Sequence, residues 1–231
     1  MIDRRLLAIS EMVIKGEPAA DIGADHAALS LYMIEHGIVP KVVASEYNEG
    51  PLNRAWQAVK NSPFQEKIEL RKGNGLEVLE PEEVSTVIIA GMGGDTIVGM
   101  LASDREKAGS FGYYLFQPMS KPDVLRNELS ISGWPILAER LVQDQRRYYA
   151  IIASCPGSTP YKLTRLEMDV GPKILKDDNK LNQTYLRYWL QKYYAVYRSL
   201  SKKDKQENNT ILEQYKKRID ELEGILNASK G

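Results

Sequence analysis

The 231-residue sequence predicts an α/β domain followed by an all-α helical hairpin, and three patterns support this prediction. Short apolar runs alternate with helical patterns up to residue 132, which is typical of a parallel sheet with right-handed crossovers. Two further apolar runs, Trp134–Val142 and Tyr148–Cys155, flank a polar turn and predict an antiparallel hairpin that makes the sheet mixed. From Leu181 onward, apolar residues recur at spacings of three and four, which predicts coiled-coil-like helices.

Five apolar runs in the first part of the chain predict the parallel strands. The clearest is the fourth, because it is continuously apolar and rich in β-branched residues. The five runs are Ala19–Ile22, Lys41–Glu46, Ile68–Lys72, Val84–Ala90 and Tyr113–Gln117. With the hairpin, they predict a sheet of seven strands.

Helical patterns separate these strands. We expect an opening helix because apolar residues from Leu6 to Ile14 have helical spacing, and a second helix that Gly37 closes. Proline near the first turn marks two others. The helices expected after the opening one are Ala27–His36, Pro51–Asn61, Thr96–Leu101 and Pro122–Ser132.

The last third of the chain predicts two paired helices. The segment 156–160 is rich in Pro, Gly and Ser, so we expect domains at 1–158 and 159–231. A polar link, Ser201–Asn209, is short enough to return the chain and predicts an antiparallel hairpin. The first apolar seam is Leu186, Trp189, Tyr193, Val196 and Leu200, and the second is Leu212, Tyr215, Ile219, Leu222 and Leu226.

Composition excludes several classes of site. One cysteine, Cys155, excludes an internal disulfide and a cysteine-cluster metal site, and the two histidines do not suffice for a histidine-rich one. No apolar run approaches bilayer length, and the N-terminus has no signal-peptide pattern. We therefore expect a cytoplasmic protein without metal, membrane or obligate protein partner.

Charge is unevenly distributed along the chain. Residues 1–160 carry 16 Lys and Arg against 21 Asp and Glu, whereas residues 161–231 carry 15 against 10. An acidic front and a basic tail suggest that the tail meets a polyanion. A lysine-rich solvated helix surface would give the same pattern, so both interpretations stay open.

The turn after the first predicted strand is the most informative local feature. The strand ends in Asp21-Ile-Gly23, and a helix follows. One glycine with two acids, Asp21 and Asp25, lacks the three-glycine pyrophosphate fingerprint. Such a turn suits a cofactor with hydroxyls and a positive centre, such as S-adenosylmethionine. We expect Asp25 to cap the following helix, while neighbouring His26 fits a structural or a catalytic role.

Polar or small residues also end the other predicted strands. Glu46 stands where a carboxylate accepts hydrogen bonds from ribose hydroxyls, although dinucleotide enzymes use the same device and a solvated loop acid is the alternative. Asn74 can read an adenine edge or merely form a turn. The glycines of Ala90–Gly94 suggest the floor of a reactive site, or a tight turn in which Asp95 caps the next helix.

Three of these segments together resemble the bacterial tRNA (adenine-22-N1)-methyltransferase family. They are Asp21–His26, Gly73–Val78 and Ile89–Gly94, and the resemblance extends over the whole chain. It implies a class I (Rossmann-like) methyltransferase domain and a helical tRNA-binding domain. It also implies S-adenosyl-L-methionine as methyl donor, S-adenosyl-L-homocysteine as product, and N1 of adenine 22 in tRNA as target.

The resemblance assigns residues to these roles. For the donor it implies Asp21, Gly23, Ala24, Asp25, His26, Glu46, Tyr47, Asn74, Gly75, Ala90, Gly91, Met92 and Gly93. Asp25 and His26 are also the candidates for contacting the flipped target base. The candidates for binding the rest of the RNA are Gln117, Arg146, Arg147, Lys202, Lys203, Lys216 and Lys217.

The residues alone leave two other functions open. One is an NAD-dependent oxidoreductase, which would favour a glycine-richer first turn. The other is a non-catalytic RNA-binding or dimerising module that uses the helical hairpin, although such a module has no need of acids and glycines at successive strand ends.

Overall fold

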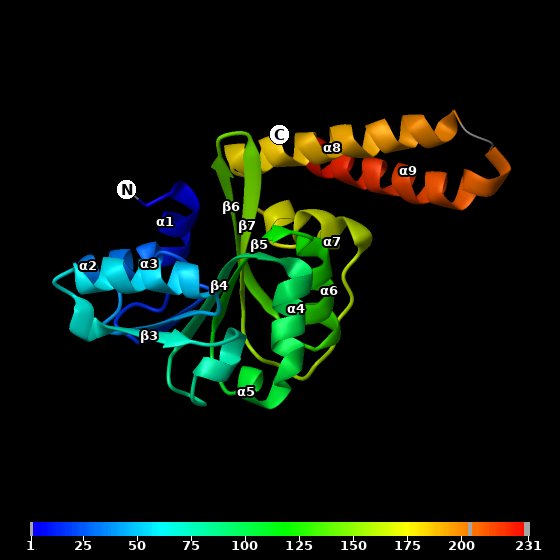
Figure 1. Cartoon of the computed structure of the whole chain (residues 1–231). Coiled ribbons are helices and arrows are strands. Elements are labelled where there is room, and N and C mark those ends of the chain that lie inside the picture. Colours follow the sequence, from blue (N-terminus) through cyan, green and yellow to red (C-terminus); the bar gives the residue numbers. More distant parts are fainter. Residues whose placement is uncertain (1, 203–204, 229–231) are drawn as a thin grey trace. The chain divides into compact units, whose positions relative to one another are not determined.

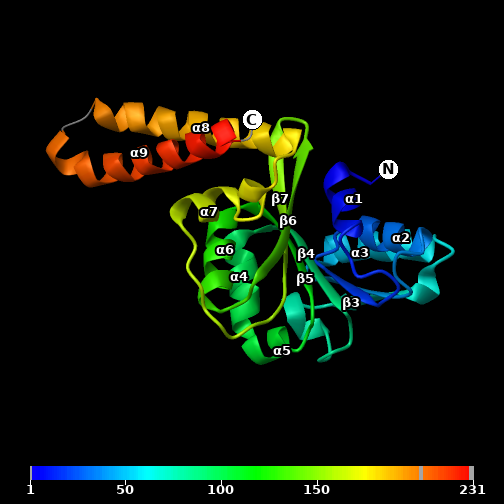
Figure 2. The same cartoon turned by 180° about the vertical axis from the view of Figure 1, so that it is seen from behind.

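The computed structural model describes residues 2–202 and 205–228, without the side chains of 205–208. The chain forms two compact units, Met1–Lys162 and Leu163–Gly231 (Figures 1 and 2). Within the described ranges, no helix is both long and apolar enough to cross a membrane.

The first unit is built on a seven-stranded mixed sheet in the order β3-β2-β1-β4-β5-β7-β6. β1 to β5 run parallel, whereas β7 is antiparallel to both β5 and β6. This confirms the predicted mixed sheet with its terminal hairpin. The strands are β1 (Ala19–Ile22), β2 (Val42–Glu46), β3 (Ile68–Lys72), β4 (Thr86–Gly93), β5 (Tyr114–Ser120), β6 (Ile136–Asp144) and β7 (Arg147–Ser154).

Helices cover both faces of this sheet. Figures 1 and 2 show α1, α2 and α3 on one side of the strands and α4, α5 and α6 on the other. Burial on both faces explains why the central strands read as continuous apolar runs, and Ile88, Leu115 and Ile151 are fully buried. The helices are α1 (Arg4–Ser10), α2 (Ala28–Glu35), α3 (Glu49–Lys60), α4 (Gly94–Ser103), α5 (Arg105–Gly109) and α6 (Pro122–Ile131), with 3₁₀ turns η1 (Gln65–Lys67) and η2 (Gly75–Val78).

Two predicted boundaries are wrong for local reasons. The opening helix ends at Ser10, before the apolar residues that continue its spacing, because the Ile14 backbone N–H instead donates to Thr86 Oγ1 (3.3 Å). The expected break at Gly91 is a bulge inside a longer β4, with register shifts against β5 on both sides of Met92. A glycine with φ of +81° bends the strand there without ending it.

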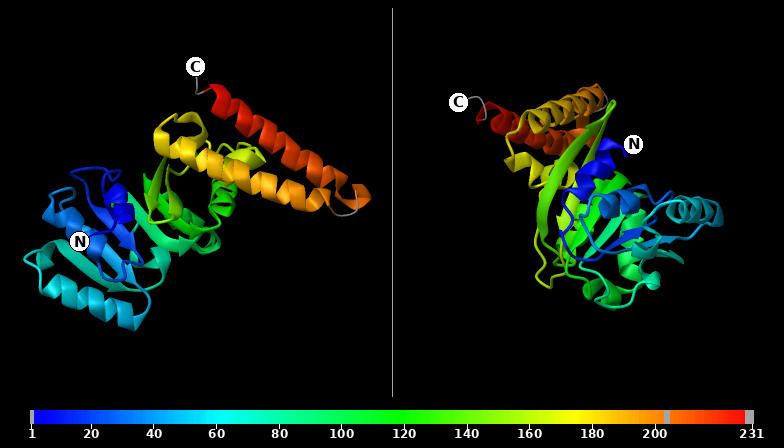
Figure 3. Two further views of the ribbon diagram at one scale, coloured as in Figure 1. Left: turned by 90° about the horizontal axis from the view of Figure 1, so that it is seen from above. Right: turned by 90° about the vertical axis from the view of Figure 1, so that its left-hand side faces the viewer.

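The second unit is helical (Figure 3). It contains α7 (Arg165–Val170), η3 (Ile174–Lys176), α8 (Lys180–Ser201) and α9 (Lys205–Ala228). The last two form the expected hairpin, and the buried seam residues are Leu186, Tyr193, Ile219, Leu222 and Leu226. The prediction was wrong for Val196, which is 38% exposed, and the link is shorter than expected because α9 begins at Lys205.

A polar contact ties α7 to this hairpin. The Tyr193 hydroxyl donates to Asp169 Oδ2 (2.7 Å), and both residues are buried. Arg165 also reaches Asp169 Oδ1 (2.7 Å). The sequence pattern did not show α7, because its six residues are too short for helical periodicity to emerge.

Candidate active site

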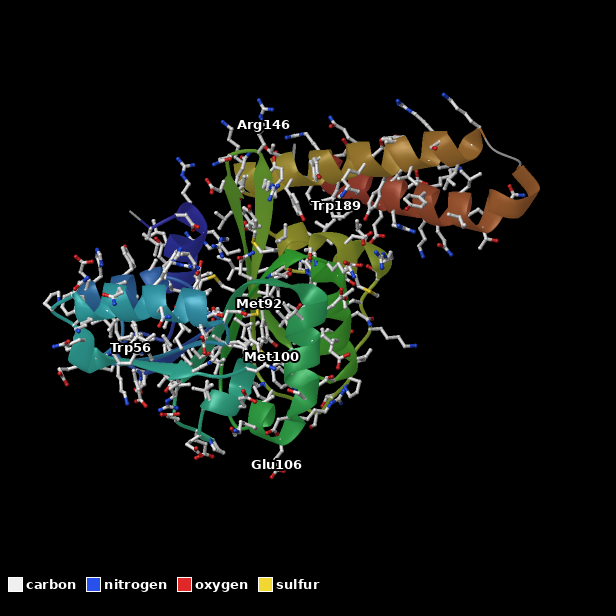
Figure 4. All side chains as sticks on the ribbon, in the orientation of Figure 1. Trp56, Met92, Met100, Glu106, Arg146 and Trp189 are labelled. Carbon is white, nitrogen blue, oxygen red and sulfur yellow. The ribbon has the colours of Figure 1, made fainter. Side chains whose placement is uncertain are left out.

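A cleft of about 680 Å³ opens at the carboxyl ends of β1 to β4. Ligands bind at this edge of an open α/β sheet, where the direction of strand order reverses. All but one of the residues predicted for the donor line the cleft; the exception is Gly93. The lining adds residues that sequence reasoning missed: Asp3, Arg5, Asn48, Thr96, Met100 and Met119, among others. Two of its methionines, Met92 and Met100, are labelled in Figure 4.

The turn after β1 is tight and strained. Gly23 has φ of +75°, and a Cβ at this position would collide with the Met92 side chain. Asp25 and Ala27 adopt left-handed φ values of 46° and 53°, which cost energy for non-glycine residues. Asp25 does not cap α2, contrary to expectation: the N-cap is Ala27, which makes no side-chain capping bond. The Asp25 side chain does not cap the helix and instead lines the cleft.

Asp21 is a buried carboxyl group at the floor of the cleft. Its Oδ2 accepts a hydrogen bond from Ser30 Oγ (2.7 Å), and the residue is 4% exposed. Burial raises the pKa of Asp21 to about 6, against the opposing effects of the Ser30 hydrogen bonds and the Arg5 charge.

Asp25 and His26 share one guanidinium, that of Arg54 on α3. Arg54 Nη2 donates to Asp25 Oδ1 (3.0 Å) and Arg54 Nε donates to His26 Nδ1 (3.1 Å). Because an arginine can only donate, His26 Nδ1 is the acceptor and the ring proton lies on Nε2, 3.5 Å from Asp25 Oδ2. Sequence reasoning missed Arg54, since nothing in its local sequence relates it to a turn 28 residues earlier.

The ends of β2 and β3 supply an acid and an amide. Glu46 is 8% exposed, and its Oε1 accepts from the backbone N–H of Asn48 (2.9 Å). At β3, Glu77 accepts the backbone N–H of Asn74 and fixes the turn, so Asn74 has a structural role while still lining the cleft. Gly75 (φ +60°) has no room for a Cβ beside Met100.

The glycines at the end of β4 and the start of α4 serve different purposes. Gly91 lines the cleft, whereas Gly93 is the N-cap of α4. Gly94 packs directly against the Lys121 carbonyl, where a Cβ would not fit. The predicted capping role of Asp95 is wrong: Asp95 lies in the first turn of α4 and pairs with the Lys121 side chain.

An arginine from the opening helix completes the lining. Arg5 Nη1 donates to Gln117 Oε1 (2.6 Å), and Arg5 Nη2 donates to Asp3 Oδ2 (3.2 Å). Gln117, predicted to touch the substrate, is instead fully buried and outside the cleft lining. Its side chain therefore orients Arg5, which is largely shielded with 17% of its side chain exposed.

None of the other predicted RNA-binding residues that the structure describes is among the residues that line the cleft. Arg146 and Arg147 are exposed at the tip of the β6–β7 hairpin, where Figure 4 labels Arg146. Lys202, Lys216 and Lys217 are exposed in the second unit, and Lys203 lies outside the described residues. The described residues contain no group of three or more His, Cys, Asp and Glu that could hold a metal ion.

Comparisons with known proteins identify the family of the chain. The sequence profile of a family described as "Methyltransferase domain" matches residues 2–152. The tRNA (adenine(22)-N(1))-methyltransferase of Bacillus subtilis strain 168 is 26% identical over 233 residues, which cover 97% of each chain. A Mycoplasma genitalium protein, named provisionally as a tRNA methyltransferase, is 30% identical over 79% of this chain and 84% of its own.

A solved structure also points to a tRNA methyltransferase. A Streptococcus pneumoniae protein, provisionally an m1A22 tRNA methyltransferase solved in complex with S-adenosyl-L-methionine, superposes with a TM-score of 0.83 and 27% identity. The match covers 98% of this chain and all of that one. The resemblance seen in the sequence is confirmed, and the oxidoreductase and non-catalytic alternatives are not favoured. The chain belongs to the methyltransferase domain family and, within it, to the S-adenosylmethionine-dependent tRNA (adenine-22-N1)-methyltransferases.

Proposed function

We propose that the protein transfers a methyl group from S-adenosyl-L-methionine to N1 of adenine 22 in tRNA. The observation that carries this proposal is the cleft at the ends of four adjacent parallel strands, lined by the residue types that this donor needs. We assign methyl transfer to residues 1–158 and tRNA binding to residues 159–231. A tRNA substrate also implies a cytoplasmic enzyme.

The order of strands in the sheet arranges the donor-binding groups. Asn74 on the β3 side suits the adenine, and Glu46 at the end of β2 suits the ribose hydroxyls. The next strands, β1 and β4, bring Asp21 and Gly91 beside Arg5, where the amino-acid part of the donor would end. Arg5 is the one arginine among the described residues of the lining, and its guanidinium suits the carboxylate of the donor. The bound donor supplies an electrophilic methyl group on a sulfonium.

Asp25 and His26 are our candidates for holding the target base at the mouth of the cleft. Neutral adenine has a lone pair on N1, so the residues need not remove a proton from it. The Asp25 carboxylate can accept from the 6-amino group and stabilise the positive charge that methylation leaves on the base. The main contribution of these residues is therefore positioning and electrostatics.

The test is incubation of the protein with tRNA and methyl-labelled donor, followed by nucleoside analysis. We expect N1-methyladenosine in the wild-type tRNA, and none in a tRNA whose adenosine 22 is replaced by guanosine. Label in another nucleoside, or equal label in both tRNAs, would refute the assignment.

Variants test the roles of the two candidate residues. Asp25→Ala and His26→Ala should each lower the methylation rate at saturating donor while leaving the affinity for tRNA in place. If both variants fold and methylate tRNA at the wild-type rate, neither residue positions the base.

A further inference from the structure

The two helices of the hairpin differ sharply in charge. α8 carries four basic residues, Lys180, Arg187, Lys192 and Arg198, and no acidic one. α9 carries four basic residues and five acidic ones. The basic character of the tail is therefore concentrated on one helix and does not spread over the whole domain.

Three of the α8 bases, together with the residue that ends the helix, form a line along one face. At 3.6 residues per turn, positions 180, 187, 198 and 202 fall within about 60° of one another around the helix axis. The line is about 33 Å long, at 1.5 Å per residue. We call Lys180, Arg187, Arg198 and Lys202 the α8 stripe.

The α8 stripe faces away from the packed side of its helix. The buried residues Leu186 and Tyr193 lie on the other side of the helix, about 130° and 150° from the centre of the stripe by helical geometry. All four stripe residues are exposed. Two residues between them on the same face, Thr184 and Gln191, are neutral, polar and exposed.

Among the described residues, the two arginines of the α8 stripe form no ion pair with a carboxylate. Arg187 Nη2 donates to Gln183 Oε1 (3.2 Å), and Arg198 lies 5.6 Å from the centre of the Tyr194 ring. Over the residues that the structure describes, neither arginine has an acidic partner within 4.0 Å. Their full charge is available to a ligand.

The outward face of α9 is different. Lys216 and Lys217 share one surface depression with Glu213, Asp220 and Glu221. Three acids around two lysines cancel the attraction for a polyanion. The two lysines predicted from the sequence are therefore poor candidates for holding RNA, and the charge argument favours α8.

We propose that the α8 stripe is the surface that docks the sugar-phosphate backbone of tRNA. This inference rests on the proposed function and specifies which helix face serves it. A line of exposed bases without acids is complementary to a chain of phosphates, and its neutral polar residues can add hydrogen bonds to phosphate and sugar oxygens. The contacts position the RNA without reading its sequence.

The experiment removes the stripe charges in the full-length protein. The variant Lys180→Gln, Arg187→Gln, Arg198→Gln and Lys202→Gln is titrated with tRNA at several KCl concentrations. Because each lost phosphate contact lowers the slope of log affinity against log salt by about one, we expect a slope smaller by about two to four and at least tenfold weaker binding near physiological salt. The KM for tRNA should rise, while kcat and donor affinity stay unchanged.

Two matched variants serve as controls. Arg187→Lys with Arg198→Lys keeps the charges and should retain the wild-type slope. Lys216→Gln with Lys217→Gln removes two charges from α9 and should change tRNA affinity less than Arg187→Gln with Arg198→Gln does. Thermal unfolding of each variant verifies that these exposed changes leave the fold intact.

The outcomes separate the two proposals. The docking proposal would be overturned by unchanged tRNA affinity and salt slope in the four-site variant. It would also be overturned if the α9 variant lost as much tRNA affinity as Arg187→Gln with Arg198→Gln. Neither result would contradict the proposed methylation of tRNA. A wild-type protein that binds tRNA through the stripe and methylates none of it would refute the proposed function alone.

Discussion

At the scale of one residue, the buried carboxyl group of Asp21 should make the free energy of unfolding depend on pH. Its pKa is raised to about 6, above the ordinary value of 3.8, so the folded protein holds this proton more tightly than the unfolded chain. This contribution to the free energy of unfolding is therefore largest at low pH, and falls as pH rises from about 4 to about 6.

Replacing Asp21 by Asn removes that titration. Between pH 4 and pH 7.5 the wild type should lose the contribution of the Asp21 proton, whereas Asp21→Asn should not. The unfolding free energy of the variant minus that of the wild type should therefore rise by roughly 1–3 kcal/mol over this range. Urea unfolding at these two pH values measures it. A difference that does not vary with pH would contradict the burial argument.

Arg5 makes a prediction about donor recognition. The wild-type protein should bind S-adenosylmethionine more tightly than its decarboxylated analogue, by about 10- to 100-fold for a charged hydrogen bond. In Arg5→Gln this preference should nearly vanish, and in Gln117→Leu it should be intermediate because Gln117 only orients Arg5. Calorimetric titration with both compounds measures the ratio.

Arg4 offers a matched control for this experiment, since it is exposed on the same helix. Arg4→Gln should keep the wild-type preference between the two donors. If Arg5→Gln also keeps it, the donor carboxylate is held elsewhere.

Arg54 makes a spectroscopic prediction. It donates to Nδ1 of His26, so the neutral ring should carry its proton on Nε2. ¹⁵N shifts of the imidazole nitrogens report the tautomer, and His36→Gln assigns the signals because the chain has two histidines. In Arg54→Gln we expect a mixture of both tautomers. Nδ1 protonation in the wild-type protein would be incompatible with the observed contact.

The site residues differ in how far the sequence could predict them. Glu46 is the last residue of β2 and Gly23 directly follows β1, so local pattern and sheet direction were enough to predict that both lie at one edge. Arg5 and Arg54 reach the site from helices, through contacts with Gln117 and His26 at separations of 112 and 28 residues. Such contacts depend on tertiary packing, which leaves no periodic signal.

At the scale of elements, α6 and β6 share a buried ion pair. Arg126 Nε donates to Glu139 Oε1 (2.7 Å), and both side chains are fully shielded from solvent. Glu139→Gln removes the carboxylate charge that faces this buried guanidinium and should cost about 3–5 kcal/mol of unfolding free energy. Chemical denaturation measures this cost.

The double change Arg126→Met with Glu139→Leu is the informative comparison. Removing both charges together should destabilise the protein much less than removing the acid alone, because the desolvation penalty disappears with them. Equal losses in the two variants would mean that packing, and not charge, governs this position.

Strand identity was easier to predict than element ends. The predicted runs of β1 and β3 match the observed strands residue for residue. Burial of all four residues explains the match for β1, whereas β3 is an edge strand with only Ile68 buried, and the glycine that follows it marks its end. β4 extends past the predicted break because pairing with β5 continues through a bulge. The cap of α2 was mispredicted because Asp25 adopts a left-handed conformation that only the assembled turn enforces.

At the scale of the whole molecule, the chain divides between Lys162 and Leu163. A protein truncated after Lys162 should bind S-adenosylmethionine within about twofold of the full chain, because the described residues that line the cleft all precede that point. Its tRNA affinity should fall by more than tenfold, since the α8 stripe is gone. Calorimetry and fluorescence anisotropy measure the two affinities.

The far-ultraviolet circular dichroism spectrum of the truncated protein should still be that of a folded protein with both helices and strands. Undiminished tRNA affinity in a folded truncated protein would contradict the assignment of RNA binding to the second unit.

Among the residues that the structure describes, the lining of the cleft contains four carboxyl side chains and one guanidinium: Asp3, Asp21, Asp25, Glu46 and Arg5. This excess of acids makes the cleft unfavourable for anions. If tRNA is the substrate, as proposed, we expect an everted nucleotide to enter with its heterocycle leading and its phosphates outside the cleft. We expect free nucleotides to bind poorly for the same reason, because their phosphates are not anchored elsewhere on the enzyme.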